Sequence, residues 1–323
     1  VVVRGLWQFQ SVATASEMCA LRRPYAIHID GMLGPVGRNQ RLKYLKKLPY
    51  WVMVERRCVS RAAAAIFTND EEERLARSFL PYSRWNPVVV SHSVDPLPPA
   101  SADDIADLLA RFPELRGKTS VLYLGRLHPI KGCDILIRAF AQAFRADEEV
   151  HLVLAGPAVD AGYLARIRRL AKACGMAHRI TWPGMVAGRD KSALFSLASV
   201  FVSPSHGENF GISAVEALAF GLPVILTDKV NVHSLLGASG AALVCEDTEE
   251  GLAQSLRKWR ALGADERGAL RARQLAVWKE QFSRDSVGPA LDRIYSHLGT
   301  PGLVTSQAMR VPIAGGGAVI ARH

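Results

Sequence analysis

The sequence lacks most features of proteins that cross a membrane or are held together by disulfide bonds. It has no uninterrupted run of about 18 apolar residues, so no membrane-spanning helix is predicted. Its five cysteines are odd in number, lie far apart and never form a Cys-x-x-Cys pair, which argues against a disulfide framework and a zinc site. Such cysteine usage favours the reducing cytoplasm. No Gly-x-Gly-x-x-Gly motif follows a predicted strand, which argues against a nicotinamide-dependent oxidoreductase.

Positive charge is what the chain has in excess. Its formal net charge is +10, and residues 38–61 carry eight basic side chains against the single acid Glu55. Tyr44, Tyr50 and Trp51 are interleaved with these charges. Such a segment suits peripheral contact with an anionic membrane or a phosphate-bearing acceptor, although a solvated helix face explains it equally well. The same charge would attract nucleic acid, but no nucleic-acid-binding motif is recognised, so no such partner is predicted.

The chain divides into two halves, because 323 residues with 49% hydrophobic side chains are ample for two packed domains. Residues 1–98 are predicted to form a partial N-terminal domain. Its predicted elements are strands at residues 1–3, 25–29, 64–67 and 88–90 and a helix at 13–21. Pro96, Pro98 and Pro99 then interrupt the pattern, and residues 99–117 are interpreted as a linker.

From Ser120 onward, short apolar strands alternate with helices. This alternation predicts a doubly wound α/β domain over residues 118–284, with a parallel sheet covered on both faces. Ligands of such sheets bind at the carboxyl ends of the strands. Residues 300–323 are rich in glycine, alanine and valine and are expected to form a disordered tail. The predicted strands are 121–124, 151–155, 179–182, 199–202, 223–227 and 242–244, and the helices include 133–144, 163–174, 191–198 and 212–220.

The loop after the strand at 121–124 combines two cations with the start of a helix. Arg126 offers a planar fork of donors and Lys131 a point charge, and together they suit a diphosphate. The helix that starts at Cys133 adds backbone N–H groups and the positive end of its dipole. Two surface cations flanking a turn are the alternative interpretation. Gly156 ends the next strand in a tight turn, which is a weak signal by itself.

A second loop, residues 203–211, runs from a strand into the helix at 212–220. Glu208 lies in the loop and Glu216 lies within the helix. Carboxylates at such places suit the hydroxyl groups of a ligand, because a carboxylate accepts several hydrogen bonds. The sequence neighbours of Glu216 are apolar, so the helix is predicted to be largely buried and this carboxylate to need a partner.

These loops lie in a pattern that resembles family 4 of the retaining glycosyltransferases, which have the GT-B fold. The pattern joins Gly125-Arg126-Leu127 and Lys131-Gly132 to the strand ending at Gly156 and to Glu208-x7-Glu216. The two glutamates stand in the setting Glu-Asn-Phe-Gly…Glu-Ala-Leu-Ala-Phe-Gly-Leu-Pro-Val, and only this full context is specific. The resemblance covers residues 118–284 well and continues more loosely through parts of residues 1–98.

The resemblance implies a role for each residue of these loops. Arg126 and Lys131 would bind the diphosphate of a nucleotide sugar and stabilise charge on the leaving group. Glu208 would complete the catalytic set beside the donor sugar, and Glu216 would hold the ribose hydroxyls. Such enzymes use no cofactor and no metal, because the cations and the helix dipole compensate the diphosphate charge. The other implied donor-binding residues are Gly125, Gly156, Met185, Asn209, Phe210 and Gly211.

The resemblance also implies two facing Rossmann-like, doubly wound domains, of which the N-terminal one is expected to be incomplete. The opening strand of the family, with its glycine-rich loop, is not recognised before the linker. A helix at 285–299 is expected to cross back to the N-terminal domain. Asp30 and Gly31 are the candidate acceptor-side residues, and Asp30 departs from the histidine that relatives often carry there.

Together these features predict a retaining, metal-independent transferase that moves a hexose from a UDP- or GDP-linked sugar. The expected acceptor is a glycan or a lipid-linked acceptor in cell-surface polysaccharide synthesis. The protein would act in the cytoplasm, at the inner face of the membrane. The alternative is a non-catalytic nucleotide-sugar-binding module, which the short N-terminal half and Asp30 would favour.

Overall fold

The computed structural model describes residues 1–34, 47–79 and 84–298, and these residues form two compact units. Of the described residues, the first unit comprises Val1–Ser93 together with the chain from Glu280 to Leu298, and the second comprises Val94–Lys279. The predicted tail, residues 300–323, lies outside the described residues. The same is true of residues 38–46 of the predicted basic segment, which include Tyr44 and the four basic residues Arg38, Arg41, Lys43 and Lys46.

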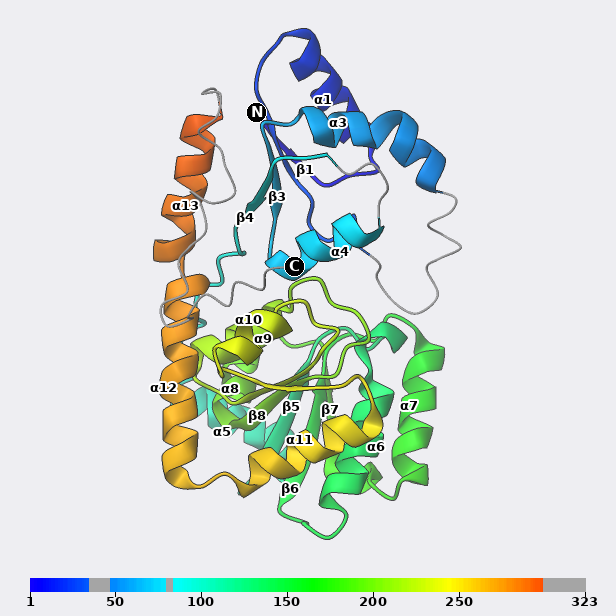
Figure 1. Cartoon of the computed structure of the whole chain (residues 1–323). Coiled ribbons are helices and arrows are strands. Elements are labelled where there is room, and N and C mark those ends of the chain that lie inside the picture. The colour runs from blue at the N-terminus through cyan, green and yellow to red at the C-terminus, as the bar shows by residue number, and fades with distance from the viewer. Residues whose placement is uncertain (35–46, 80–83, 299–323) are drawn as a thin grey trace, which may run out of the picture. The chain divides into compact units, whose positions relative to one another are not determined.

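The first unit is built on a parallel sheet in the order β1-β2-β3-β4. The strands lie where the sequence predicted them, at β1 (Val2–Arg4), β2 (Ala26–His28), β3 (Ala64–Phe67) and β4 (Pro87–Val89). Every residue of β2 and β3 is buried, and all of them except His28 are apolar, as expected for a parallel sheet covered on both faces. The helical elements of this unit are α1 (Phe9–Ala20), the short η1 (Trp51–Glu55), α3 (Arg56–Arg61) and α4 (Asp70–Phe79), of which Figure 1 labels the α-helices.

The last helix, α13 (Arg284–His297), packs on this sheet. Val287, Ala290 and Ile294 form one buried cluster with residues of β2, β3 and β4. These three residues recur at spacings of three and four, so one face of the helix is apolar and covers the sheet. A segment from the end of the chain thus completes the core of the unit that contains its start.

The second unit holds a parallel sheet in the order β10-β9-β8-β5-β6-β7. Within this sheet the first strand along the chain is β5, in the middle. The next two strands, β6 and β7, lie on one side of β5, and β8 lies on its other side. The strand order therefore reverses between β5 and β8, which is the place where doubly wound sheets bind ligands. The strands are β5 (Thr119–Leu124), β6 (Val150–Ala155), β7 (Ile180–Gly184), β8 (Ala198–Ser203), β9 (Val224–Thr227) and β10 (Leu243–Cys245).

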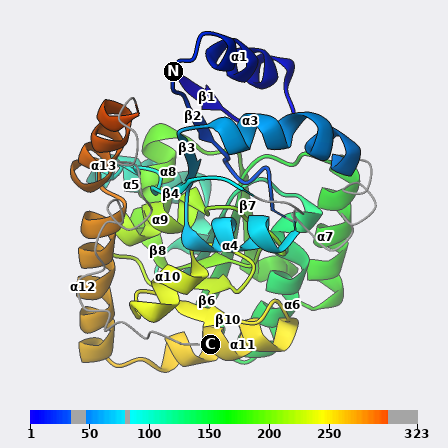
Figure 2. The same ribbon diagram turned by 45° about the horizontal axis from the view of Figure 1, so that its top comes forward.

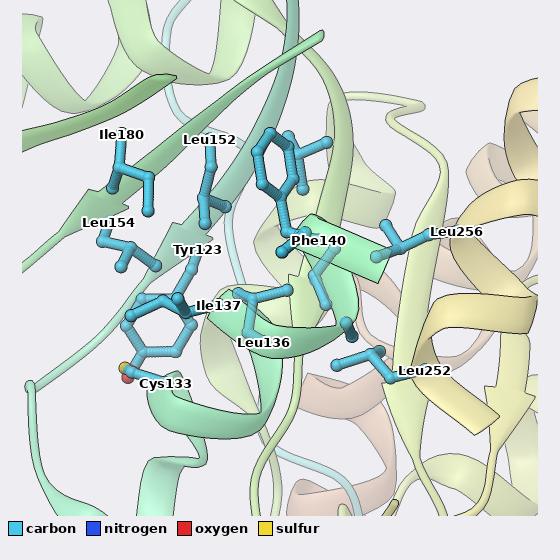
Figure 3. Packing of buried hydrophobic residues seen from close by; sticks show 14 of the residues in the cluster. Tyr123, Cys133, Leu136, Ile137, Phe140, Leu152, Leu154, Ile180, Leu252 and Leu256 are labelled. Carbon is cyan, nitrogen blue, oxygen red and sulfur yellow. The ribbon is translucent and has the colours of Figure 1, made fainter. Parts of the chain in front are cut away.

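Helices cover both faces of this sheet, as the predicted doubly wound fold requires (Figures 1 and 2). α6 (Cys133–Phe144) packs against α7 (Ala161–Ala173) and α11 (Glu249–Ala261) on one face. Figure 3 shows Leu136 and Phe140 of α6 among Leu152 and Leu154 of the sheet and Leu256 of α11. The remaining helices are α5 (Ala102–Arg111), α8 (Gly188–Leu197), α9 (Ile212–Ala219), α10 (His233–Ala238) and α12 (Ala264–Gln281).

The segment 99–117, interpreted from the sequence as a linker, contains α5 and belongs to the second unit. Ser101 and Asp104 form a capping box: the Ser101 hydroxyl accepts the Asp104 N–H, and the Asp104 carboxylate accepts the Ser101 N–H. α5 packs on α8, and its Arg111 pairs with Asp190 of that helix at 2.6 Å. The three prolines that suggested a linker stand just before this helix. Among the described residues, no helix is long and apolar enough to span a membrane.

Candidate functional site

The reversal of strand order brings the loops after β5 and β8 together. The backbone N–H of His206 donates to the carbonyl oxygen of Ile130 over 2.8 Å, which joins the two loops directly. Gly132 makes this approach possible, because a Cβ atom at its position would lie 1.9 Å from the carbonyl oxygen of Pro204. Gly132 also has a φ of +66°, a conformation that favours glycine.

A similar close approach joins the loops after β5 and β6. Gly156 has a φ of +142°, and a Cβ atom there would lie 1.9 Å from the carbonyl oxygen of Gly125. The N–H of Gly125 donates to the carbonyl of Ala155 at 3.0 Å, and that of Gly156 donates to Gly184 at 2.7 Å. Both predicted glycines therefore lie where backbone segments meet, and Gly125 also lines the cavity of the site.

These loops surround a cavity of 210 Å³ at the carboxyl edge of the sheet. Five residues predicted for the site line this cavity: Gly125, Arg126, Lys131, Glu208 and Gly211. The first residues of α9 line it as well, with Gly211 as the N-cap in a left-handed conformation at φ +83°. The N-terminus of a helix offers N–H donors and a positive dipole end, so this wall favours an anion.

Two of the predicted catalytic residues form an ion pair across the cavity. The ammonium group of Lys131 bonds to the carboxylate of Glu208, and the two side chains are 14% and 27% exposed. Lys131 ends the short helix η3 (Pro129–Lys131), where the Nδ1 of His128 accepts the N–H of Ile130 at 3.2 Å. Arg126 is exposed and lies at the rim of the cavity. The site thus holds one cation paired inside and one at its edge.

The loop that carries Glu208 is fastened to the loop after β9. The backbone N–H of Glu208 donates to the carbonyl oxygen of Lys229 at 2.9 Å, and the carbonyl oxygen of Glu208 accepts the N–H of Asn231 at 2.9 Å. The side-chain amide of Asn231 also donates to the side-chain oxygen of Asn209 at 3.3 Å. The side chain of Phe210 is buried, so it anchors the loop and leaves only backbone groups to meet a ligand.

The other five predicted donor-side residues lie outside the cavity lining: Gly156, Met185, Asn209, Phe210 and Glu216. Met185 follows β7 and is 76% exposed. Glu216 lies on α9 with its side chain 12% exposed, and it pairs with Lys191 of α8, whose Nζ is 2.5 Å from Oε1. The sequence predicted that buried Glu216 needs a partner but did not identify Lys191, because the packing of α8 on α9 has no local signal.

A second pair that sequence reasoning missed stands behind the same loop. The Nδ1 of His206 lies 2.6 Å from an oxygen of Asp247, whose side chain is only 6% exposed. Asp247 follows β10, so this contact ties the loop after β8 to a distant part of the sheet edge. Within the part of the chain that the structure describes, no group of three or more His, Cys, Asp and Glu side chains could hold a metal ion.

The predicted acceptor-side residues lie at the carboxyl end of β2 in the first unit. Asp30 has a φ of +48°, and its Oδ2 lies 3.8 Å from the guanidinium of Arg4. Its Oδ1 is buried and has no hydrogen-bond partner among the described residues. Burial lowers the pKa of His28 and of His92, and Asp30 acts on both in the opposite direction.

Gly31 is held by a buried carboxylate that the sequence did not mark. Its N–H donates to Glu72 at 2.5 Å, and Thr68 donates both its N–H and its hydroxyl to the other oxygen of Glu72. Glu72 is 1% exposed, and burial raises the pKa of its carboxyl group. This network joins the loops after β2 and β3, and so fixes the backbone beside Asp30.

Comparison with known proteins supplies an independent finding. The model of the family described as glycosyl transferases group 1 matches residues 104–273. D-inositol 3-phosphate glycosyltransferase of Segniliparus rotundus is 36% identical over 107 residues, which is 32% of this chain and 24% of that protein. The protein of the same name from Mycobacterium marinum is 27% identical over 252 residues, which is 75% of this chain and 52% of that protein. The chain thus spans about half or less of the length of these relatives.

Solved structures share the fold. The crystal structure of Anabaena Alr3699/HepE in complex with UDP and glucose has a TM-score of 0.75 and 19% identity, and the match covers 91% of this chain and 77% of that one. This likeness confirms the predicted α/β fold of the GT-B type. The cavity and its cations lie within the segment that the family model matches.

Proposed function

Because this chain belongs to the glycosyl transferases of group 1, we propose that it transfers a hexose from a UDP- or GDP-linked sugar to a glycan or a lipid-linked acceptor, in cell-surface polysaccharide synthesis. The observation that carries the proposal is the cavity at the strand-order reversal. Arg126, Lys131 and the N-terminus of α9 converge there, and such a set of positive groups suits a diphosphate.

The Lys131–Glu208 pair suggests how the donor enters. A diphosphate brings more negative charge to Lys131 than one carboxylate does, so it would compete for the ammonium group. Glu208 would then accept hydrogen bonds from hydroxyl groups of the donor sugar. As the bond to the sugar breaks, charge grows on the leaving phosphate, where Lys131 and Arg126 stabilise it without a metal ion. We propose that the hydroxyl of the acceptor attacks the anomeric carbon from the same face as the leaving phosphate and gives its proton to that phosphate, so the reaction retains configuration.

The remaining predicted residues extend the donor site in this proposal. The backbone of Asn209, Phe210 and Gly211 would meet the sugar and phosphate, and Met185 would lie beside the base. Glu216 would hold the ribose hydroxyls. On the first unit, the Oδ1 of Asp30 would accept a hydrogen bond from a hydroxyl group of the acceptor. A buried carboxylate oxygen without a partner is stabilised most by such a hydrogen bond.

Calorimetric titration with UDP, GDP and ADP tests the donor site. We expect one of the three to bind, and Lys131→Ala to weaken it roughly tenfold to hundredfold, since the variant loses a charge-assisted hydrogen bond. Lys172→Ala is the matched control, because Lys172 is exposed on α7, away from the cavity lining. Equal affinity of the Lys131→Ala variant and the wild type would refute the assignment. Tight donor binding without sugar transfer or hydrolysis would favour the non-catalytic module.

We further propose that the described part of residues 38–61 contacts an anionic membrane at its cytoplasmic face. Met53, Arg57 and Arg61 follow one another at spacings of four on η1 and α3, and all three are exposed. With residues of α1 they line a groove of 430 Å³. Trp51 takes no part in this surface, because it is buried in the core of the first unit.

Sedimentation with lipid vesicles tests this contact. We expect the protein to bind vesicles that contain phosphatidylglycerol and not to bind vesicles of phosphatidylcholine. Binding should decline as salt is added. Arg61→Glu should reduce binding several-fold, at about 1 kcal/mol for each basic residue near the surface. Arg169→Glu on α7 makes the same charge change on another exposed helix face. If both variants lose binding equally, net charge and not this surface is responsible.

A further inference from the structure

Glu216 is held in an unusual way for a carboxylate on a mostly apolar helix. Its Oε1 accepts the ammonium group of Lys191 at 2.5 Å, while its Oε2 is buried and has no hydrogen-bond partner among the described residues. The two side chains are 12% and 19% exposed, so both charges are largely removed from water. A buried polar atom without a partner is rare in folded proteins and requires an explanation.

Lys191 reaches Glu216 from a helix that is fixed elsewhere. The preceding residue Asp190 pairs with Arg111 of α5 at 2.6 Å, and α5 and α8 pack along each other. The backbone of α8 is thus anchored on the side of α5, and Lys191 extends from it to α9. With Oε1 engaged by a lysine from an anchored helix, the carboxylate is restrained in one orientation and Oε2 keeps a defined direction.

We propose that Lys191 is a positioning residue for ribose recognition, which orients Glu216 so that the site selects ribonucleotides over nucleotides that lack the ribose hydroxyls. The inference rests on the proposed donor function. A carboxylate that rotates freely would lose much of a directed hydrogen bond, whereas an oriented one accepts it at full strength.

A merely structural role for this pair predicts something different. If Lys191 only tethers α8 to α9, its loss disturbs the cavity as a whole and lowers the affinity for every nucleotide by the same factor. If Lys191 orients Glu216, its loss weakens a nucleotide with ribose hydroxyls and spares one without them. The ratio of the two affinities therefore separates the roles, whatever the overall stability of the variant.

The experiment compares the best-binding diphosphate among UDP, GDP and ADP with its 2′,3′-dideoxy counterpart by calorimetry. We expect the wild type to prefer the ribonucleotide by roughly tenfold to hundredfold, as for a hydrogen bond to a charged group. In Lys191→Met the preference should fall to about threefold or less, through weaker ribonucleotide binding alone. Lys191→Arg keeps a cation on Glu216 and should keep most of the preference.

Two controls make the result decisive. Lys172→Met removes an exposed lysine from α7 and should leave both affinities unchanged. Lys191→Gln preserves a polar group of similar length and is measured in parallel, in case the Met variant does not fold. Equal weakening of both nucleotides, or an undiminished preference in the Met and Gln variants, overturns the inference. Absence of any nucleotide binding by the folded wild type overturns the proposed function and this inference with it, whereas binding without ribose preference overturns the inference alone.

Discussion

Gly132 is the residue on which the approach of the two site loops depends. It precedes α6, and its hydrogen atoms leave room for the carbonyl oxygen of Pro204 from the facing loop. A side chain there would separate the loop that carries Lys131 from the loop that carries Glu208. One small residue thus determines whether the cation and the carboxylate can share a cavity.

Gly132→Ala should therefore lower both stability and nucleotide affinity. The variant combines a left-handed backbone with a Cβ contact at 1.9 Å, and we expect a loss of about 2–4 kcal/mol in the free energy of unfolding. Gly175→Ala is the matched control, because Gly175 has a φ of +74° and nothing within 4 Å of a built Cβ. Chemical denaturation should show a cost of only about 1 kcal/mol for the control. Equal costs for the two variants would contradict the role of the close approach.

At the scale of elements, α13 shows how a helix from the end of the chain completes the first unit. Its apolar residues cover β2, β3 and β4, which contribute alanine, isoleucine and valine side chains to the shared cluster. Small side chains on a sheet allow a helix to pack closely, and the helix in turn removes their apolar surface from water. The stability of the loops after these strands thus depends on a segment far away in the sequence.

Ile294→Ala tests this dependence. Ile294 is fully buried in the cluster, so the substitution should cost about 2–4 kcal/mol through lost burial and the remaining cavity. Hydrogen exchange should become faster in β2–β4 and stay unchanged in β5–β9. Val159→Ala, at a residue that is 55% exposed, should have no measurable effect. Unchanged protection of β2–β4 in Ile294→Ala would mean that the sheet is stable without this helix.

At the scale of the whole molecule, buried histidines make the chain sensitive to acid. Burial lowers the pKa of His28 and His92, and it lowers the pKa of His151 to about 4. For His151, the nearby Glu114 acts in the opposite direction and Arg179 in the same direction as burial. The folded state therefore binds fewer protons than the unfolded state between the usual histidine pKa of 6.5 and these lowered values.

Stability should consequently be full above the usual histidine pKa and fall as the pH drops below it. For His151 the window runs from 6.5 down to about 4, and we expect a loss of about 2 kcal/mol across it. Urea denaturation at a series of pH values measures this slope. His151→Gln should flatten it, whereas His178→Gln, at an exposed histidine that lowers the pKa of His151 less than burial does, should change it much less. An unaltered slope in His151→Gln would refute the assignment. The buried carboxyl of Glu72, whose pKa burial raises, acts in the opposite direction in every variant alike.

Much of the second unit was predictable, because its signals are local. The helix Cys133–Phe144 was predicted to the residue, and every strand of this sheet was found within two residues of its ends. Strand and helix periodicity, glycine at helix ends and the family pattern all lie within short stretches of chain. The helix α5 was not predicted, although its Ser-x-x-Asp cap is also a local signal. The three prolines before it are typical of a linker, and they indicated one instead of a helix.

The loops that carry the cations and carboxylates could be identified from residue type and spacing, which are properties of the chain alone. Which of these side chains meet follows from the folded arrangement of the strands and helices. The reversed strand order places β5 beside β8, and the packing of α8 brings Lys191 to Glu216 across 25 residues. Such contacts depend on the sum of many weak burial terms over a whole sheet and its helices. No short segment holds that sum, so the partner of Glu216 became visible only in the folded molecule.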